Sequence, residues 1–138
     1  MPTIFEQIVS GEIPGRIVHE TDSTAAFLDA NPLARGHTLV IPKEPYERLD
    51  DMPAEVASDV FGVVHELTPV IEAAVDADAT TIGMNNGEAA GQEVPHAHVH
   101  IVPRFDGDGG GPIHAVSPSR PELSDAELDE IEAAISEG

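Results

Sequence analysis

The sequence predicts an α+β protein in which helices pack on an antiparallel sheet. Two short segments, Arg16–Glu20 and Thr24–Leu28, read as strands on either side of a polar turn at residues 20–23. A much longer segment, from about Pro53 to Asp76, repeats its apolar residues at helical spacing. Strands joined by a tight turn pair antiparallel, and an amphipathic helix needs a surface to cover, so we expect a sheet with this helix on it.

The first predicted element is a short helix at the N-terminus. Thr3 and Glu6 form a capping-box pattern, which predicts a helix from Thr3 to about Ser10. Further strands are predicted where apolar and β-branched residues cluster, and the loop Asn85–Glu93 joins the last two of them. These strands are Thr38–Ile41, which Pro42 ends, Thr80–Met84 and Val94–Val102.

The long helix contains one residue that does not suit a helix. Its apolar stripe consists of Val56, Val60, Val63, Val64, Leu67, Val70, Ile71 and Val75. Pro69 lies within the same span, lacks the N–H of a helical hydrogen bond and clashes with the preceding turn. We therefore predict that the helix kinks or splits at Pro69.

The last quarter of the chain has a different composition. Residues 105–122 combine three consecutive glycines with acidic residues and prolines and show no periodicity, which predicts a long loop. A second capping box, Ser124–Glu127, opens a final helix whose apolar stripe is Leu128, Ile131 and Ile135. By length the chain is one domain, so we expect residues 1–104 to form its body and residues 105–138 to pack on it.

The charge of the chain is unusual. It has 26 acidic residues against 6 basic ones, for a net charge of −20, and Lys43 is its single lysine. Such a chain repels nucleic acid, so no nucleic-acid partner is predicted. It also repels itself, but at 1 M salt the Debye length falls to about 3 Å and the repulsion is screened. We therefore predict a halophilic protein that works in a salt-rich cytoplasm.

Nothing in the sequence indicates a membrane or disulfide-bonded protein. No run of about 18 apolar residues is present, so no membrane partner is predicted. The N-terminus lacks the basic and apolar regions of a signal peptide, and there is no cysteine. A cytoplasmic location is the simplest expectation.

Three histidines carry the strongest functional signal. His96, His98 and His100 alternate with Ala97, Val99 and Ile101, which is the period of a strand. The apolar residues should face a core, and the three imidazoles should line the other face. Imidazole titrates near neutral pH and is both a nucleophile and a proton carrier, so such a row indicates catalysis.

A metal site is the first alternative for these histidines. Alternate residues of a strand lie roughly 6.6 Å apart, and the outer pair roughly 13 Å, so all three could not share one ion. Two of them could, but the remaining ligands would have to come from elsewhere, and no cysteine is available. We predict no metal and no other cofactor; a histidine strand without function is the second alternative.

At these residues the chain resembles a known family. The stretch from His96 to Val102 fits the His-φ-His-φ-His-φ-φ signature of the histidine triad (HIT) family, and residues 3–104 resemble its Hint and Fhit branch. The resemblance implies a half-barrel sheet, an α+β fold and a homodimer. The supporting blocks are Ile4–Phe5, Glu12–Pro14, Ala26–Asp29, Gly36–Lys43 and Gly83–Gly87.

The resemblance also implies a role for each histidine. His98 would attack the α-phosphorus of a nucleotide, with one ring nitrogen bonded to a backbone carbonyl, and water would then release the nucleoside monophosphate. His100 would bond a phosphate oxygen or the leaving atom. His96 would support the site together with His37.

Other residues are expected to bind the nucleotide. The resemblance places Asp29 on the ribose hydroxyls, and Phe5, Ile8 and Phe27 around the base. Because cations are scarce, the phosphate needs neutral donors. These are the backbone N–H groups of Gly91, Gln92, Glu93 and Val94, and the side-chain amides of Asn85 and Gln92. Glu93 departs from relatives with Ser or Thr at this position, and its carboxylate would repel a phosphate unless it points away.

The sequence therefore predicts a hydrolase or transferase that cleaves purine nucleoside phosphoramidates or related adenylated small molecules. The alternatives are a dinucleoside polyphosphate hydrolase, a nucleotide-binding regulatory protein with incidental turnover, and a metal-binding protein. Ala97 stands where the galactose-1-phosphate uridylyltransferase branch has Pro, and the lack of cysteine argues against the aprataxin branch.

Overall fold

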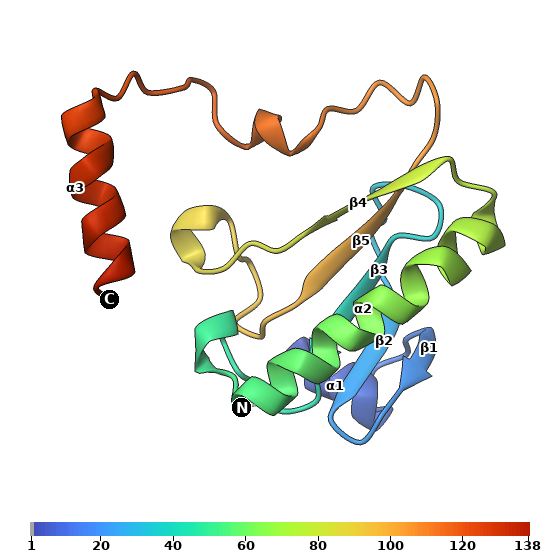
Figure 1. Ribbon diagram of the computed structural model, residues 1–138. Helices are drawn as coiled ribbons and strands as arrows, with labels where there is room; N and C mark the ends of the chain where they lie inside the picture. The colour runs from blue at the N-terminus through green and yellow to red at the C-terminus, as the bar shows by residue number, and fades with distance from the viewer. Residues whose placement is uncertain (1) are drawn as a thin grey trace.

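The computed structural model describes residues 2–138 and contains one sheet with helices on both of its faces (Figure 1). The helices and strands follow the predicted order, and three short 3-10 turns occur at Leu49–Asp51, Glu88–Ala90 and Ile113–Val116. The elements are α1 (Ile4–Ser10), β1 (Ile17–Glu20), β2 (Thr24–Leu28), β3 (Thr38–Pro42), α2 (Ala54–Val75), β4 (Ala79–Gly83), β5 (Val99–Arg104) and α3 (Asp125–Ser136).

The five strands form one antiparallel sheet in the order β1-β2-β3-β5-β4, which confirms the predicted α+β class. β5, which carries His100, lies between β3 and β4, so the histidine segment is placed inside the sheet rather than at an edge. His100 pairs with Leu39 of β3 and with Gly83 of β4.

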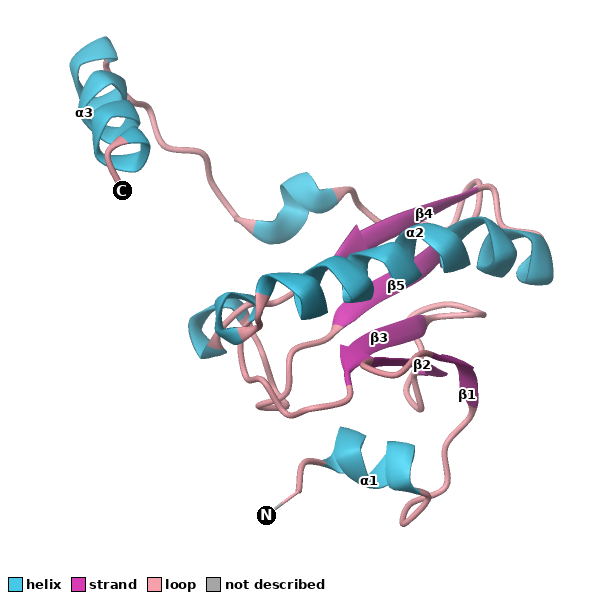
Figure 2. Ribbon diagram, turned by 60° about the horizontal axis from the view of Figure 1, so that its bottom comes forward, coloured by secondary structure: helices cyan, strands magenta, loops and turns pink. Residues whose placement is uncertain are grey.

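The two faces of the sheet bury separate cores. On one face α2 packs Val60, Val63, Val64, Leu67 and Ile71 against the predicted inward residues Ala97, Val99 and Ile101 (Figure 2). On the other face α1 contributes Phe5 to a smaller core with Ala25, Phe27, Leu39 and Ile41. Because both faces are covered, β2 and β3 are buried at nearly every position.

α2 runs through Pro69 as one helix, so of the two predicted outcomes, a kink or a split, the split does not occur. Pro69 and His65, the residue one turn earlier, both lie on the exposed side of the helix. The carbonyl that loses its helical partner therefore faces solvent, which satisfies it. The hydroxyl of Thr68 also donates to the Val64 carbonyl at 2.7 Å.

A carboxylate on α2 holds the turn between β1 and β2. Oδ2 of Asp59 accepts hydrogen bonds from the hydroxyls of Thr24 (2.6 Å), Thr21 (2.7 Å) and Ser23 (2.7 Å). These bonds, that of Thr24 first, lower the pKa of Asp59. The helix and the first hairpin are thereby joined by polar contacts at a point where the apolar core ends.

The histidine strand begins later than predicted. β5 starts at Val99, whereas the alternation suggested Val94. The N–H of His96 donates to the Val94 carbonyl at 2.8 Å across Pro95, so the chain turns there. The N–H of Ala97 then bonds the Tyr46 carbonyl at 2.7 Å instead of a neighbouring strand.

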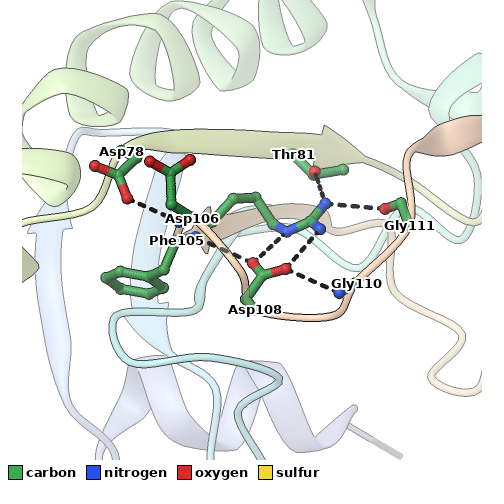
Figure 3. A network of polar contacts seen from close by, with 8 residues as sticks. Asp78, Thr81, Phe105, Asp106, Asp108, Gly110 and Gly111 are labelled. Atoms are coloured by element: carbon green, nitrogen blue, oxygen red, sulfur yellow. Dashed lines mark hydrogen bonds and ion pairs between the residues drawn. The ribbon is translucent and has the colours of Figure 1, made fainter.

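The chain leaves the sheet through a tight polar loop after β5. Asp108 accepts from the Arg104 guanidinium at 2.9 and 3.0 Å and from the N–H groups of Phe105 (3.0 Å) and Gly110 (2.8 Å) (Figure 3). The bond from Arg104 is the largest of the causes that hold the pKa of Asp108 far below its usual range. Arg104 also donates to the Thr81 hydroxyl on β4. The direction of the following residues is therefore fixed.

Residues 106–138, here called the C-terminal arm, are exposed along their whole length. α3 stands apart from the sheet, so the predicted packing of residues 105–138 on the body is not observed within the chain (Figures 1 and 2). Its stripe of Leu128, Ile131 and Ile135 is uncovered. Among the described residues, no helix is long and apolar enough to cross a membrane.

Candidate active site

The hydrogen bonds of His98 leave one of its ring nitrogens free to react. Nδ1 of His98 lies 2.8 Å from the backbone carbonyl of His96. A carbonyl oxygen can only accept, so Nδ1 carries the proton and Nε2 keeps its lone pair. The ring is 9% exposed and Phe5 packs on it edge-on, with centroids 5.0 Å apart. This is the arrangement that a nucleophilic imidazole requires.

A backbone donor determines the protonation of His37 and, through it, of His100. The N–H of Leu33 donates to Nδ1 of His37 at 3.0 Å, so the proton of a neutral His37 is on Nε2. That nitrogen lies 2.9 Å from Nδ1 of His100, which must then accept. The proton of His100 is therefore on its Nε2, which makes this nitrogen a hydrogen-bond donor.

His100 and His37 are held in their neutral forms. Burial, followed by the neighbouring His98 and His37, lowers the pKa of His100 to about 4. Burial is also the main cause that lowers the pKa of His37, and the Asp29 carboxylate opposes it in part. At neutral pH the site thus contains a neutral donor, His100, whose ring centroid lies 5.0 Å from that of His98.

His96 lies behind the site. Its Nε2 donates to the Pro42 carbonyl at 2.7 Å, and its Nδ1 accepts from the Thr3 hydroxyl at 2.6 Å. The ring is fully buried, and burial lowers its pKa. The family resemblance implied that His96 supports the site together with His37, but in the structure His37 pairs with His100 and His96 with Thr3. His96 therefore joins α1 to β3 and directs its own carbonyl at His98.

A cleft of about 480 Å³ lies beside His98 and His100. It collects the predicted base-binding residues, because α1 covers the sheet at this point. Phe5 and Phe27 meet edge to face at 5.3 Å and, with Ile8, form its apolar wall. Seven further lining residues were not predicted, although four of them lie in the blocks that support the family resemblance. The seven residues are Ile4, Pro14, Gly15, Leu28, Ala30, Asn31 and Leu39.

Asp29 lies in the same cleft and is held from two sides. Its Oδ1 accepts from the Asn31 N–H at 2.9 Å, and its Oδ2 lies 3.6 Å from Nε2 of His37. The carboxylate is 21% exposed and has further lone pairs, so it can accept from a hydroxyl-bearing ligand.

The loop between β4 and β5 supplies fewer donors than predicted. The Gln92 amide donates to the carbonyls of Glu47 (2.6 Å) and Val94 (3.0 Å), and its oxygen accepts from the Gly87 N–H. Gln92 therefore holds the loop and is not available as a phosphate donor. The N–H groups of Gly91 and Gln92 are also used, in bonds to the carbonyls of Glu88 and Gly87.

Two further N–H groups of this loop belong to residues that line the cleft. Within residues 2–138 the N–H groups of Glu93 and Val94 make no hydrogen bond, and both residues line the cleft with Asn85. Gly91 has φ +98°, a backbone conformation that favours glycine, at the corner where the loop turns toward them. Asn86 was not identified from the sequence; its Oδ1 accepts from the Leu49 N–H and fixes the other end of the loop.

One group of side chains could in principle bind a metal ion. Three possible ligand atoms lie within 4.8 Å of one another, one each from Asp29, His37 and His100. The sequence analysis weighed only the three histidines of the triad and missed this combination. However, Leu33 occupies Nδ1 of His37 and places the proton on Nε2, the atom that faces the other two ligands. The bonding favours a hydrogen-bonded relay over an ion.

The chain matches the HIT domain family over residues 10–107. It belongs to this family. It is 46% identical over 106 residues to an uncharacterized HIT-like protein of Methanocaldococcus jannaschii, covering 77% of this chain and 81% of that one. Its fold is shared with a HIT family protein of Bacillus subtilis of known structure, with a TM-score of 0.86 at 33% identity, covering 99% of this chain and 96% of that one.

Two relatives of the HIT chain carry the names of nucleotide-cleaving enzymes. It is 39% identical to the adenosine 5'-monophosphoramidase of Candida albicans over 75% of this chain and 70% of that one. It is 40% identical to the bis(5'-nucleosyl)-tetraphosphatase of Schizosaccharomyces pombe over 70% of this chain and 53% of that one. Together with the family, these relatives support a nucleotide hydrolase.

Proposed function

We propose that this HIT protein hydrolyses purine nucleoside phosphoramidates or related adenylated small molecules through a nucleotidyl-His98 intermediate. The observation that carries the proposal is the complementary protonation of two adjacent imidazoles. His98 offers a lone pair at Nε2, and His100 offers an N–H at Nε2. A nucleophile next to a donor is what displacement at phosphorus needs.

The reaction proceeds in two balanced steps. In the first, the lone pair of His98 Nε2 forms a bond to the α-phosphorus while the P–N bond breaks. The electron pair of that bond stays on the amine nitrogen, which takes up a proton from solvent. In the second, water attacks phosphorus, the His98–phosphorus bond breaks, and the proton lost by the water returns to solvent. In both steps His100 Nε2–H and the free N–H groups of Glu93 and Val94 donate to the phosphate oxygens.

A dinucleoside polyphosphate hydrolase is the second candidate, because the Schizosaccharomyces pombe relative carries such a name. The two candidate reactions differ in the charge of the leaving group. A polyphosphate is strongly anionic, yet neither Lys nor Arg is among the residues that line the cleft. This favours the phosphoramidate, and rates on an adenosine phosphoramidate and on diadenosine tetraphosphate would separate the two.

We further propose that the protein is a homodimer that works at high salt. The uncovered stripe of α3 supports the dimer, because an isolated 12-residue helix is marginal in water unless its apolar side is covered. The Bacillus subtilis structure aligns over nearly the whole chain, so the arm has a counterpart there. The net charge of −20 supports the second point.

Replacing the nucleophile tests the mechanism. His98→Ala should lower turnover of an adenosine phosphoramidate by at least about a thousandfold while nucleoside monophosphate still binds, because the cleft walls remain. Mass spectrometry after an alkaline quench should find one nucleoside monophosphate on the parent and none on the variant. His65→Ala, on the exposed side of α2, is the control. Activity within tenfold of the parent in His98→Ala would refute the mechanism.

A further inference from the structure

The cleft that would receive the substrate phosphate has neither Lys nor Arg in its lining. Its acidic lining residues are Asp29 and Glu93, and His100 is neutral in the bonding described above. Asp29 is engaged by the Asn31 N–H and lies near His37. A substrate phosphate must therefore rely on neutral N–H donors in a field that is already negative.

The negative charge of Glu93 in this cleft is not neutralised by any ion pair among the described residues. Within residues 2–138 its carboxylate makes no ion pair and no hydrogen bond, and the residue is exposed. Arg48 lies against Gly87 of the same loop, but it pairs with Asp50 at 3.1 Å and lines no part of the cleft. The charge of Glu93 therefore acts on whatever occupies the cleft.

Glu93 also lies between the cleft and a second hollow, into which a leaving group can extend. Its neighbour Val94 packs against the apolar cluster of Phe5, whereas the Glu93 side chain is exposed. The same residue lines a neighbouring hollow of about 240 Å³ together with Glu47, Glu88, Gln92 and Pro95. A group that leaves the phosphorus into this hollow meets three carboxylates and no cation.

We propose that Glu93 selects the leaving group by its charge, and that the preferred substrate is a nucleoside phosphoramidate of an amine that carries a second, cationic group. This inference rests on the proposed function and names the substrate class within it. The bonds made and broken are those given above, and the distant ammonium stays intact throughout. An ammonium near Glu93 offsets the negative field of the cleft, whereas a carboxylate, sulfate or polyphosphate adds to it.

Three adenosine 5'-phosphoramidates with the same linker test the proposal. Their amines end in an ammonium, a neutral amide or a carboxylate, and kcat/KM is measured for each at the lowest salt that keeps the protein folded. The parent should prefer the ammonium over the carboxylate by about tenfold or more, as expected for one exposed carboxylate at short range. Glu93→Gln should reduce this ratio at least about threefold. Glu55→Gln removes the same charge from an exposed site on α2 and should leave the ratio as in the parent.

The outcomes separate this inference from the function on which it rests. If the parent does not turn over the neutral compound, the proposed function is wrong. If the parent turns over all three at equal rates, or if Glu93→Gln keeps the full ratio, the phosphoramidase stands and the role of Glu93 is refuted. A preference for the carboxylate would also refute it.

Discussion

The folded state of this protein should lose stability as the pH falls, because His100 resists protonation in the folded protein. His100 has a pKa of about 4 in the folded protein, because burial and its histidine neighbours disfavour the charge. In the unfolded chain it titrates near 6.5. As the pH falls below 6.5, His100 binds a proton in the unfolded state but not in the folded state, so unfolding becomes more favourable. The penalty is complete only below pH 4, where both states are protonated.

The size of the effect follows from the two pKa values. Their difference of about 2.5, at about 1.4 kcal/mol for each pKa unit, corresponds to about 3 kcal/mol of unfolding free energy in total. Of this, about 2 kcal/mol should be lost between pH 7 and pH 5, before the folded protein takes up much of the proton. Such a loss is a large fraction of the stability of a small domain.

Urea unfolding of the parent and of His100→Gln at pH 7, 6 and 5 measures this contribution. High salt should be present throughout, so that the carboxylates affect both proteins alike. The stability of the parent relative to the variant should fall by about 2 kcal/mol over this range. His114→Gln, on the exposed arm, should behave as the parent does.

Equal pH dependence in the parent and in His100→Gln would refute the reasoning. If the variant does not fold, ¹⁵N NMR of the parent answers the same question. The His100 ring should then stay neutral at pH 5, with its proton on Nε2. A ring that titrates near 6.5 would contradict both the burial and the hydrogen bond from His37.

Four further expectations concern metal, salt, assembly and the first hairpin. Exhaustive chelation should leave activity unchanged, whereas loss that zinc restores would show that Asp29, His37 and His100 bind a metal. The thermal midpoint and kcat/KM should both rise from about 0.1 M to above 1 M KCl, and a flat or falling profile would remove the case for a halophile. Light scattering in high salt should give twice the chain mass of 14.5 kDa, and a monomer would contradict the dimer. Asp59→Ala should lower the unfolding free energy by about 1–3 kcal/mol in urea titrations, because three hydroxyls lose a charged acceptor, and an unchanged value would show that these bonds are not stabilising.

The sequence predicted best those elements whose signals are local. The strand Thr24–Leu28 was predicted with its observed bounds, and the capping box of Thr3 and Glu6 opens α1 as expected. The start of β5 was misplaced, because alternation alone cannot show that the chain turns at Pro95. The packing of α3 could not be predicted, since an apolar stripe does not reveal which surface covers it.

In the candidate site, too, residues with a local sequence signal were predicted, whereas contacts between distant parts of the chain were not. His98, His100 and Asp29 converge on one cleft because strands β2, β3 and β5 are neighbours in the sheet. The role of Gln92 could not be predicted, because its amide bonds the Glu47 carbonyl, 45 residues away in the sequence. No local pattern distinguishes such a structural amide from one that binds a ligand.

The bond between Thr3 and His96 has a consequence for how the protein is made. The two residues are 93 positions apart, so this polar contact of the N-terminal helix forms only after the histidine segment has been made, although Phe5 can pack on β2 and β3 earlier. The histidine segment in turn is completed only when β5 enters the sheet between β3 and β4. During synthesis from the N-terminus, none of the earlier fragments contains a positioned nucleophile. Contacts this distant in sequence form slowly, so the appearance of activity should report the last step of folding rather than an early one.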